Sequence, residues 1–125
     1  MWPSILAIFC GAGLGALLRA GFNFATVSVT SALPLGTFIS NMVGGYMIGI
    51  AMAFFGNNPN LSPEWKLFVI TGFLGGLTTF SSFSAEVVAF IERGELAWAL
   101  GTALLHLLGS IALTFMGILT YQAFK

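Results

Sequence analysis

The sequence predicts an all-α integral membrane protein with four transmembrane helices, of which the third is broken. Composition is the first reason: 58% of the 125 residues are hydrophobic and 6% are charged, whereas a soluble domain carries about a quarter charged residues. The second is length, because a helix needs about 20 apolar residues to cross a bilayer. Four stretches come close to this length: residues 2–18, 35–55, 67–91 and 96–115, the last running on toward residue 121.

The segments between these stretches carry loop and turn signals. Residues 19–34 contain several serines and threonines and end with a proline, which suits a partly interfacial loop. Residues 56–64 are rich in asparagine and proline, and Pro63 fits the first position of the third helix. Residues 92–95 give a tight antiparallel turn into the fourth helix. The whole chain, residues 1–125, is therefore expected to form a single transmembrane domain.

The third stretch contains a segment that an ordinary apolar helix does not explain. Two adjacent glycines open it, two phenylalanines lie three residues apart, and five hydroxyl residues follow the glycines: Thr78, Thr79, Ser81, Ser82 and Ser84. Within hydrocarbon every backbone donor and acceptor needs a partner, so irregular backbone survives only where protein buries it or where it lines a cavity. The sequence therefore predicts a helix break and a site at the same place. Helical spacing after the break puts Phe80 and Phe83 on one face, with hydroxyls beside them.

Polar residues in two other stretches extend this site. Asn41 lies beside glycines in the second stretch, and the fourth carries a ribbon at intervals of four residues: Thr102, His106, Ser110 and Thr114. One such ribbon is equally well explained as a hydrogen-bonding contact between helices. Three polar sets in so small a protein indicate a lined pathway. No lysine or arginine falls at membrane depth, so a transported anion would meet neutral amide and hydroxyl donors and the positive edges of phenyl rings.

Three ionisable residues each have two interpretations. Glu86 is the acid that lies well within a span, which makes it a functional candidate by default, although it could also reach a watery vestibule. Arg19 ends the first apolar stretch and either snorkels to the interface or attracts anions to a pore mouth. His106 is either a satisfied buried histidine or part of the pathway. No second histidine, cysteine or carboxylate lies at the sequence spacing typical of metal ligands.

Charge and motif content exclude several functions. The four basic and four acidic residues give a net charge of zero, which leaves no basic surface for nucleic acid. The chain has one cysteine. It shows no catalytic nucleophile paired with a general base, no nucleotide-binding loop and no metal-binding motif, so we expect that it is not an enzyme.

The basic residues are also divided evenly between the two sides of the membrane. Lys66 and Lys125 fall on the side of the termini, and Arg19 and Arg93 fall on the other. The positive-inside rule then gives almost no preferred orientation. We therefore expect an antiparallel, dual-topology homodimer with its two-fold axis in the membrane plane. Terminal tags found on one membrane face alone would contradict this expectation.

Glycines at G-x-x-x-G spacing predict where helices approach closely. The pairs are Gly11 with Gly15, Gly45 with Gly49, and Gly72 with Gly76, and the fourth stretch adds Gly101, Gly109 and Gly117. Small residues let helix backbones come together in lipid. Generic packing without a functional role is the alternative for any one pair.

Three segments together resemble the bacterial fluoride channel family, known as Fluc or CrcB: residues 11–19, 36–44 and 75–84. The similarity covers essentially the whole chain. It implies a fluoride-selective passive channel in the bacterial inner membrane, which lets fluoride leave the cytoplasm and so protects the cell from its toxicity. It also implies a dual-topology homodimer with two pores.

The resemblance also assigns residues. The implied pore residues are Asn41, Phe80, Phe83, Ser81, Ser82, His106, Ser110 and Thr114, with the two phenylalanines as an aromatic box. The implied vestibule residues are Arg19, Thr37 and Glu86. A structural sodium ion at the dimer centre would be held by the backbone carbonyls of Gly75 and Thr78 from each protomer, and an unwound helix does expose carbonyls that a hard cation accepts.

Two other functions fit the same composition. A small dual-topology proton-coupled exporter needs a membrane-embedded carboxylate, for which Glu86 is the one candidate. A structural membrane partner would use the polar ribbons for packing in a larger complex, and alone it would move nothing across a bilayer.

Overall fold

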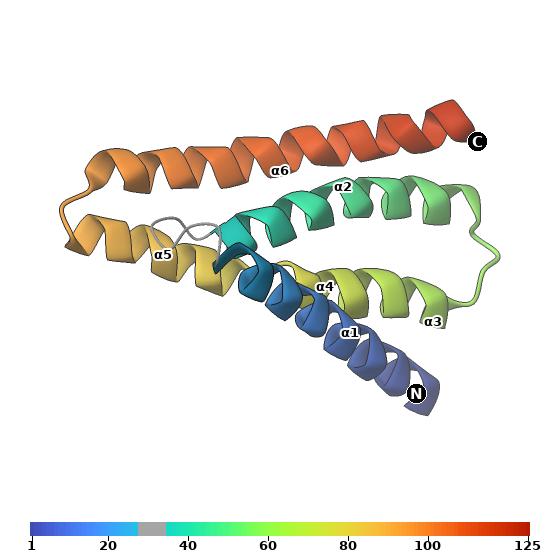
Figure 1. Ribbon diagram of the computed structural model, residues 1–125. Coiled ribbons are helices and arrows are strands. Elements are labelled where there is room, and N and C mark those ends of the chain that lie inside the picture. Colours follow the sequence, from blue (N-terminus) through green and yellow to red (C-terminus); the bar gives the residue numbers. More distant parts are fainter. Residues whose placement is uncertain (28–34) are drawn as a thin grey trace.

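The computed structural model describes residues 1–27 and 35–125. Within this part of the chain, four helical segments are long and apolar enough to cross a membrane: Trp2–Thr26, Leu35–Asn57, Pro63–Glu92 and Leu96–Phe124. This confirms the predicted four-span, all-helical fold. Both termini lie at the same end of the molecule, next to the loop that joins the second and third spans (Figure 1).

Three of the spans are continuous helices, and all three extend beyond the predicted bounds. They are α1 (Trp2–Val27), α2 (Leu35–Asn57) and α6 (Leu96–Phe124). The expectation that the first helix ends before Arg19 is wrong, because α1 continues for two more turns. Phe22 in this extension packs against the hydrophobic core, and the Thr26 hydroxyl donates to the Phe22 carbonyl at 2.8 Å. The remainder of the predicted first loop, residues 28–34, lies outside the described residues.

The third span is broken at the predicted place. It begins with α3 (Pro63–Lys66), as the proline signal predicts, and continues through the π-helical η1 (Leu67–Leu74) and α4 (Gly75–Leu77). Thr78 and Thr79 are then extended, with φ, ψ of −85°, 159° and −152°, 121°. Helix α5 (Phe80–Glu92) follows, and the Thr79 hydroxyl caps it by accepting from the Ser82 N–H at 3.1 Å. This side-chain cap lets the chain re-enter a helix directly after the break.

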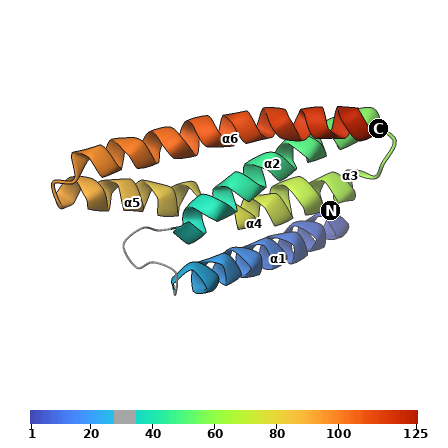
Figure 2. The same cartoon turned by 45° about the horizontal axis from the view of Figure 1, so that its top comes forward.

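Most of the helix packing lies in two groups, which contact each other mainly through α1 and α2. α6 runs beside α2, and α1 runs beside η1 and α4 (Figures 1 and 2). Glycines from both members make the α1 contact close, since a Cβ added at Gly72 would lie 2.9 Å from the Ile8 carbonyl and 3.1 Å from Gly11 Cα. A Cβ at Gly117 of α6 would likewise lie 3.1 Å from Gly49 Cα. The predicted glycine contacts are thus confirmed, except at Gly101, where an added Cβ meets no atom within 4 Å.

Replacing Gly49 with alanine is expected to destabilise the fold by about 1–3 kcal/mol, the usual cost of overpacking. A Cβ at this position would lie 3.0 Å from the Ile118 nitrogen and closer still to the Thr114 carbonyl. Gly13→Ala is the matched control, because a Cβ at Gly13 meets no atom within 4 Å and both changes raise helix propensity equally. The thermal unfolding midpoint in detergent measures the effect. Equal midpoints for the two variants would contradict the predicted contact.

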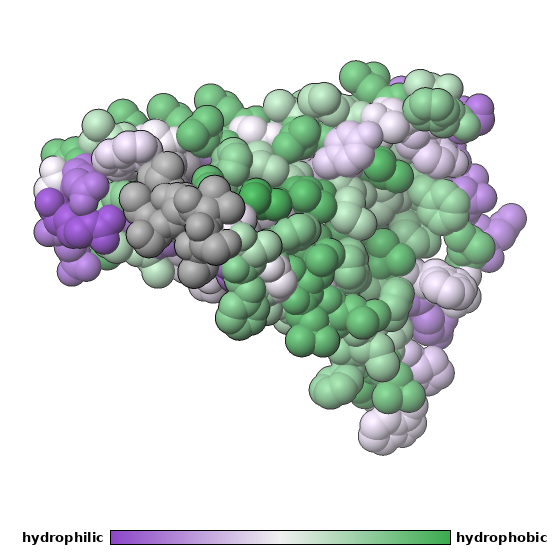
Figure 3. Space-filling view, viewed as in Figure 1, coloured by the Kyte–Doolittle hydropathy of each residue, from purple (hydrophilic) through white to green (hydrophobic). Residues whose placement is uncertain are grey.

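The surface of the molecule is largely apolar, as expected of a protein that lies in a lipid bilayer. Few side chains are buried, and the hydrophobic core centres on Ala51, Leu74 and Leu77. On the face shown in Figure 3, hydrophobic residues cover the middle of the molecule and hydrophilic residues gather mainly at its two ends. Hydrophilic ends separated by an apolar belt are the arrangement expected of transmembrane helices.

Candidate functional site

A groove of about 470 Å³ lies between α2, the broken third span and α6. Its polar lining residues are Asn41, Thr78, Thr79, His106, Ser110 and Thr114, and its aromatic ones are Phe80 and Phe83. None of the described residues that line it is Lys, Arg, Asp or Glu. Six of the eight predicted pore residues are therefore brought together in one groove. The other two, Ser81 and Ser82, are not among the lining residues.

The side chain of Asn41 completes the hydrogen bonding of the broken helix. Its Oδ1 accepts from the Thr79 N–H at 2.8 Å, and its Nδ2 donates to the Thr79 carbonyl at 3.1 Å. Asn41 thus replaces the backbone partners that Thr79 loses by leaving the helix, which hydrocarbon could not supply. Nδ2 also lies 3.1 Å from His106 Nδ1. All the hydrogen-bonding groups of this amide therefore have protein partners.

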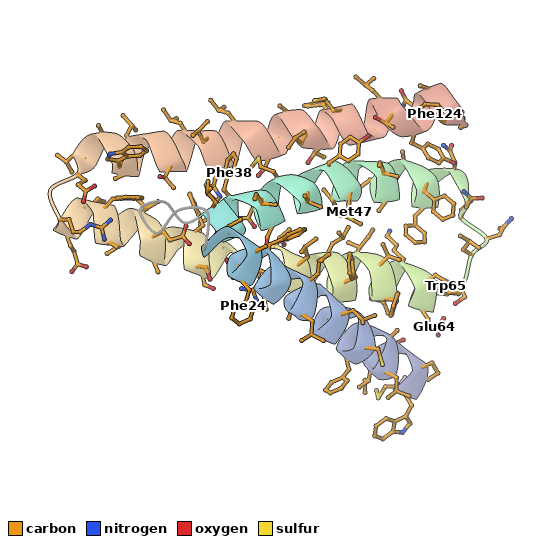
Figure 4. All side chains as sticks on the ribbon, in the orientation of Figure 1. Phe24, Phe38, Met47, Glu64, Trp65 and Phe124 are labelled. Carbon is orange, nitrogen blue, oxygen red and sulfur yellow. The ribbon has the colours of Figure 1, made fainter. Side chains whose placement is uncertain are left out.

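Aromatic rings follow one another along the groove. Phe80 meets Phe83 edge-on, with ring centroids 5.6 Å apart, and Phe83 stacks on His106 at 4.5 Å. Phe38, which projects from the start of α2 toward α6 (Figure 4), meets the same imidazole edge-on at 5.3 Å. Phe80 is the outermost ring, with 78% of its surface exposed. Its phenyl edge can line a closed pathway only if something further covers it.

The predicted ribbon on α6 does not act as one unit. His106 is buried and Ser110 lines the groove, but Thr102 is not a lining residue. The Thr114 hydroxyl is within hydrogen-bond distance of two carbonyls, that of Gly45 at 3.0 Å and that of Ser110 at 2.8 Å. Its single proton is therefore shared between a bond within α6 and a bond from α6 to α2. Thr114 thus contributes to a hydrogen-bonding contact between helices, which is the alternative explanation given above for a polar ribbon.

The backbone carbonyls at the break differ in what they bond. The Leu74 carbonyl accepts from the Thr78 N–H at 3.0 Å and the Thr78 hydroxyl at 2.8 Å, and the Thr79 carbonyl accepts from Asn41. Within the described residues, no side chain or loop N–H donates to the Gly75 or Thr78 carbonyl. These two carbonyls are the ones that the family resemblance implies as ligands of a cation.

Thr37 and Glu86, both predicted for a vestibule, meet in the structure. The Thr37 hydroxyl on α2 donates to Glu86 Oε2 on α5 at 2.6 Å. Glu86 Oε1 is sealed from solvent and has no partner among the described residues. Neither residue lines the groove. Thr37 and Glu86 thus bond each other outside the groove lining, and the vestibule role of this pair stays a prediction.

Comparison with known proteins agrees with this arrangement. The sequence pattern of the family described as CrcB-like protein, Camphor Resistance (CrcB), matches residues 6–118. The chain belongs to the CrcB-like family. Three full-length relatives carry the name fluoride-specific ion channel FluC. That of Polynucleobacter asymbioticus is 78% identical over 125 residues, which is all of both chains.

The other two relatives are more distant. The protein of Pseudomonas syringae pv. maculicola is 54% identical over 122 residues, covering 98% of this chain and 96% of the relative. That of Nitrosomonas europaea is 50% identical over 125 residues, covering 100% and 98% respectively. The likeness therefore extends over the whole CrcB-like domain, including all four spans and the break.

Sequence reasoning missed one contact of this CrcB-like chain, that of Arg19 with the break. The half-buried Arg19 Nε donates to the Gly76 carbonyl at 3.2 Å. A cation at this point also faces the carbonyl end of the helix that terminates at Leu77, where the helix dipole is negative. A signal was present, because Arg19 follows Gly11 and Gly15 at intervals of four on the α1 face that packs against the third span.

Proposed function

We propose that this chain is a fluoride-selective passive channel and that the groove between α2, α5 and α6 is one wall of its pore. The observation that carries the proposal is a groove lined by neutral donors and phenyl rings at a helix break, in a four-span chain. Relatives that match its full length are named fluoride-specific ion channels. The proposed role is to let fluoride leave the bacterial cytoplasm through the inner membrane, which protects the cell from fluoride.

Neutral lining suits this role for a physical reason. A small, strongly hydrated anion gives up water only if the protein offers other donors, and the Ser110 hydroxyl and the ring edges of Phe80 and Phe83 are available for this. Conduction also requires that each site release the ion again. A lysine or arginine in the groove would bind fluoride too firmly, and the described lining has neither.

A second copy of the chain is the proposed cover for the groove. Gly75 is exposed on the protomer surface and Phe80 is 78% exposed, so the break opens toward the outside. Lipid cannot satisfy the free carbonyls there. An antiparallel partner related by an axis in the membrane plane would bring its own break to the same place. The even division of basic residues between the two sides supports insertion in both orientations.

The dimer centre is also the proposed place for a structural sodium ion. The Gly75 and Thr78 carbonyls of each protomer would hold it, and they fit because no side chain or loop N–H of the described residues donates to them. They also lie at the negative end of the helix that finishes at Leu77. The ion would supply positive charge to four carbonyls that otherwise repel one another. The described residues contain no cluster of His, Cys, Asp or Glu for a metal, so carbonyls are the ligand type available.

The proposed function is tested with purified protein in liposomes loaded with fluoride or with chloride and held without a pH gradient. We expect rapid fluoride release and negligible chloride release. Release that appears only with an imposed pH gradient, and that Glu86→Gln abolishes, would establish the proton-coupled exporter instead. Protein that is dimeric in the membrane but releases neither ion, with or without an imposed pH gradient, would contradict fluoride transport by either route and favour the structural partner.

Removing sodium should lower fluoride flux or dissociate the dimer, because the carbonyls at the centre would lose their cation. The measurement replaces sodium with a large organic cation on both sides of the liposome and follows fluoride release together with the fraction of dimer. Lithium and potassium serve as size controls. Full flux from an intact dimer in sodium-free buffer would count against the ion.

A further inference from the structure

We infer that Asn41 acts on the pore through His106, by fixing the imidazole as the neutral tautomer that carries its proton on Nε2. His106 then offers an N–H donor to an anion in the groove, and Asn41 is a positioning residue. The inference deepens the proposed function and rests on the groove being the pore wall. Its tautomer part can be tested without measuring transport.

The helix break fixes the orientation of the Asn41 amide. The backbone N–H of Thr79 can only donate and its carbonyl can only accept. The N–H lies 2.8 Å from Oδ1 and the carbonyl 3.1 Å from Nδ2. Rotating the amide by half a turn would set two donors against each other and two acceptors against each other. The break itself therefore decides which end of the amide carries the hydrogens.

Asn41 Nδ2 also lies 3.1 Å from His106 Nδ1, within hydrogen-bond distance. An amide nitrogen has two hydrogens and no acceptor capacity, and one of its hydrogens is used by the Thr79 carbonyl. The other is available to Nδ1, which must then present a lone pair. A neutral imidazole with an accepting Nδ1 carries its proton on Nε2. A doubly protonated ring would point an N–H at the amide hydrogens, so this contact also disfavours the charged form.

The other ring nitrogen of His106, Nε2, remains free within the part of the chain that the structure describes. His106 is 6% exposed, and its ring is held between Phe83, stacked at 4.5 Å, and the edge-on Phe38 at 5.3 Å. Nε2 has no hydrogen-bond partner among the described residues. Among those residues, the side-chain atoms that lack a partner and are also sealed from solvent are Ser40 Oγ and Glu86 Oε1, so Nε2 is not sealed. His106 lines the groove. The ring is therefore immobilised by its neighbours while its one free N–H remains accessible to an ion in the groove.

The Nε2–H group of His106 is therefore a hydrogen-bond donor with a fixed orientation and no net charge. A ring held by two aromatic neighbours loses little conformational freedom when it binds an anion. A neutral N–H attracts fluoride without the firm hold of an imidazolium, which suits a site that must release its ion. The chain thus gains a nitrogen donor at membrane depth without placing a permanent cation there.

The tautomer is measured by NMR of protein labelled with ¹⁵N in the histidine ring. His106 is the one histidine of the chain, so the ring nitrogens need no further assignment. We expect Nδ1 without a proton and Nε2 with one in the wild type. In Asn41→Asp the carboxylate accepts instead of donating, so we expect Nδ1 to become protonated. A protonated Nδ1 in the wild type would overturn the inference, even if the aspartate variant does not fold.

Fluoride flux through three variants at residue 106 tests the donor. His106→Gln can place an amide N–H near the position of Nε2 and is expected to keep most of the flux. His106→Phe keeps the stacked ring but has no donor, and His106→Asn keeps an acceptor for Asn41 but does not reach as far. Both should lose about tenfold, the scale of one hydrogen bond to an ion. Wild-type flux through His106→Phe would reduce His106 to a packing residue and overturn the donor role.

These results separate failure of the inference from failure of the proposed function. Absence of fluoride flux in the wild type would remove the channel, whereas the NMR result reports the tautomer in either case. Flux that is normal in the wild type and insensitive to all three substitutions would leave the channel in place and overturn the role of His106.

Discussion

Fluoride flux is expected to fall at least about tenfold in both Phe80→Ile and Phe83→Ile, an effect of about 1.4 kcal/mol. Isoleucine keeps an apolar side chain but has no ring, so the positive edge that faces an anion is lost. Phe83→Ile should have the larger effect, because Phe83 also stacks on His106 at 4.5 Å. The measurement is release from liposomes at equal protein content, with the fraction of dimer determined in parallel.

Phe24→Ile is the matched control for this result. Phe24 is 80% exposed, almost the same as Phe80 at 78%, but it lies on α1 and away from the groove (Figure 4). A loss of flux common to all three variants would indicate general destabilisation. Wild-type flux in both groove variants would refute the aromatic pathway.

The second large effect is expected at Arg19. Arg19→Met removes the Nε–H that the Gly76 carbonyl accepts at 3.2 Å, and a hydrogen bond to a charged group contributes about 1.5–3 kcal/mol. The carbonyl would remain at the break without a donor, so we expect a lower unfolding midpoint as well as a loss of flux. Arg19→Lys separates two roles, because lysine keeps the charge but not the geometry of Nε. Wild-type flux in Arg19→Lys would instead support a role of the charge in attracting anions to a pore mouth.

Arg93→Met provides the comparison for Arg19. Arg93 pairs with Glu95 at 2.7 Å, but both side chains are substantially exposed, at 55% and 40%. Exposed pairs contribute at most about 1 kcal/mol. Arg93→Met should therefore leave flux unchanged and shift the unfolding midpoint little. If the two methionine variants behave alike, the contact of Arg19 with the break has no special role.

Local chemistry made much of this fold predictable. Backbone N–H and C=O groups in the hydrocarbon core must be hydrogen-bonded within the protein, so the four long apolar stretches were predicted to be helices. The glycines and hydroxyl residues of segment 75–84 predicted the helix break. The G-x-x-x-G spacing predicted the close helix contacts at Gly49 and Gly72. Spacing along single helices also nominated Asn41, His106 and Ser110, which the groove brings together. Each of these features depends on residues that are close in the sequence.

The remaining features needed the packing of helices against one another. Only the approach of α2 to the break shows that Asn41 bonds Thr79 on both sides, and only the position of α6 sets the proton of His106 on Nε2. The extension of α1 to Val27 and the contact of Arg19 with Gly76 arise in the same way. Hydrogen-bond partners far apart in the chain are chosen by which helix faces meet. The sequence alone therefore determined the spans, the break and the neutral polar residues, and the tertiary structure decided which of their donors remain free for an ion.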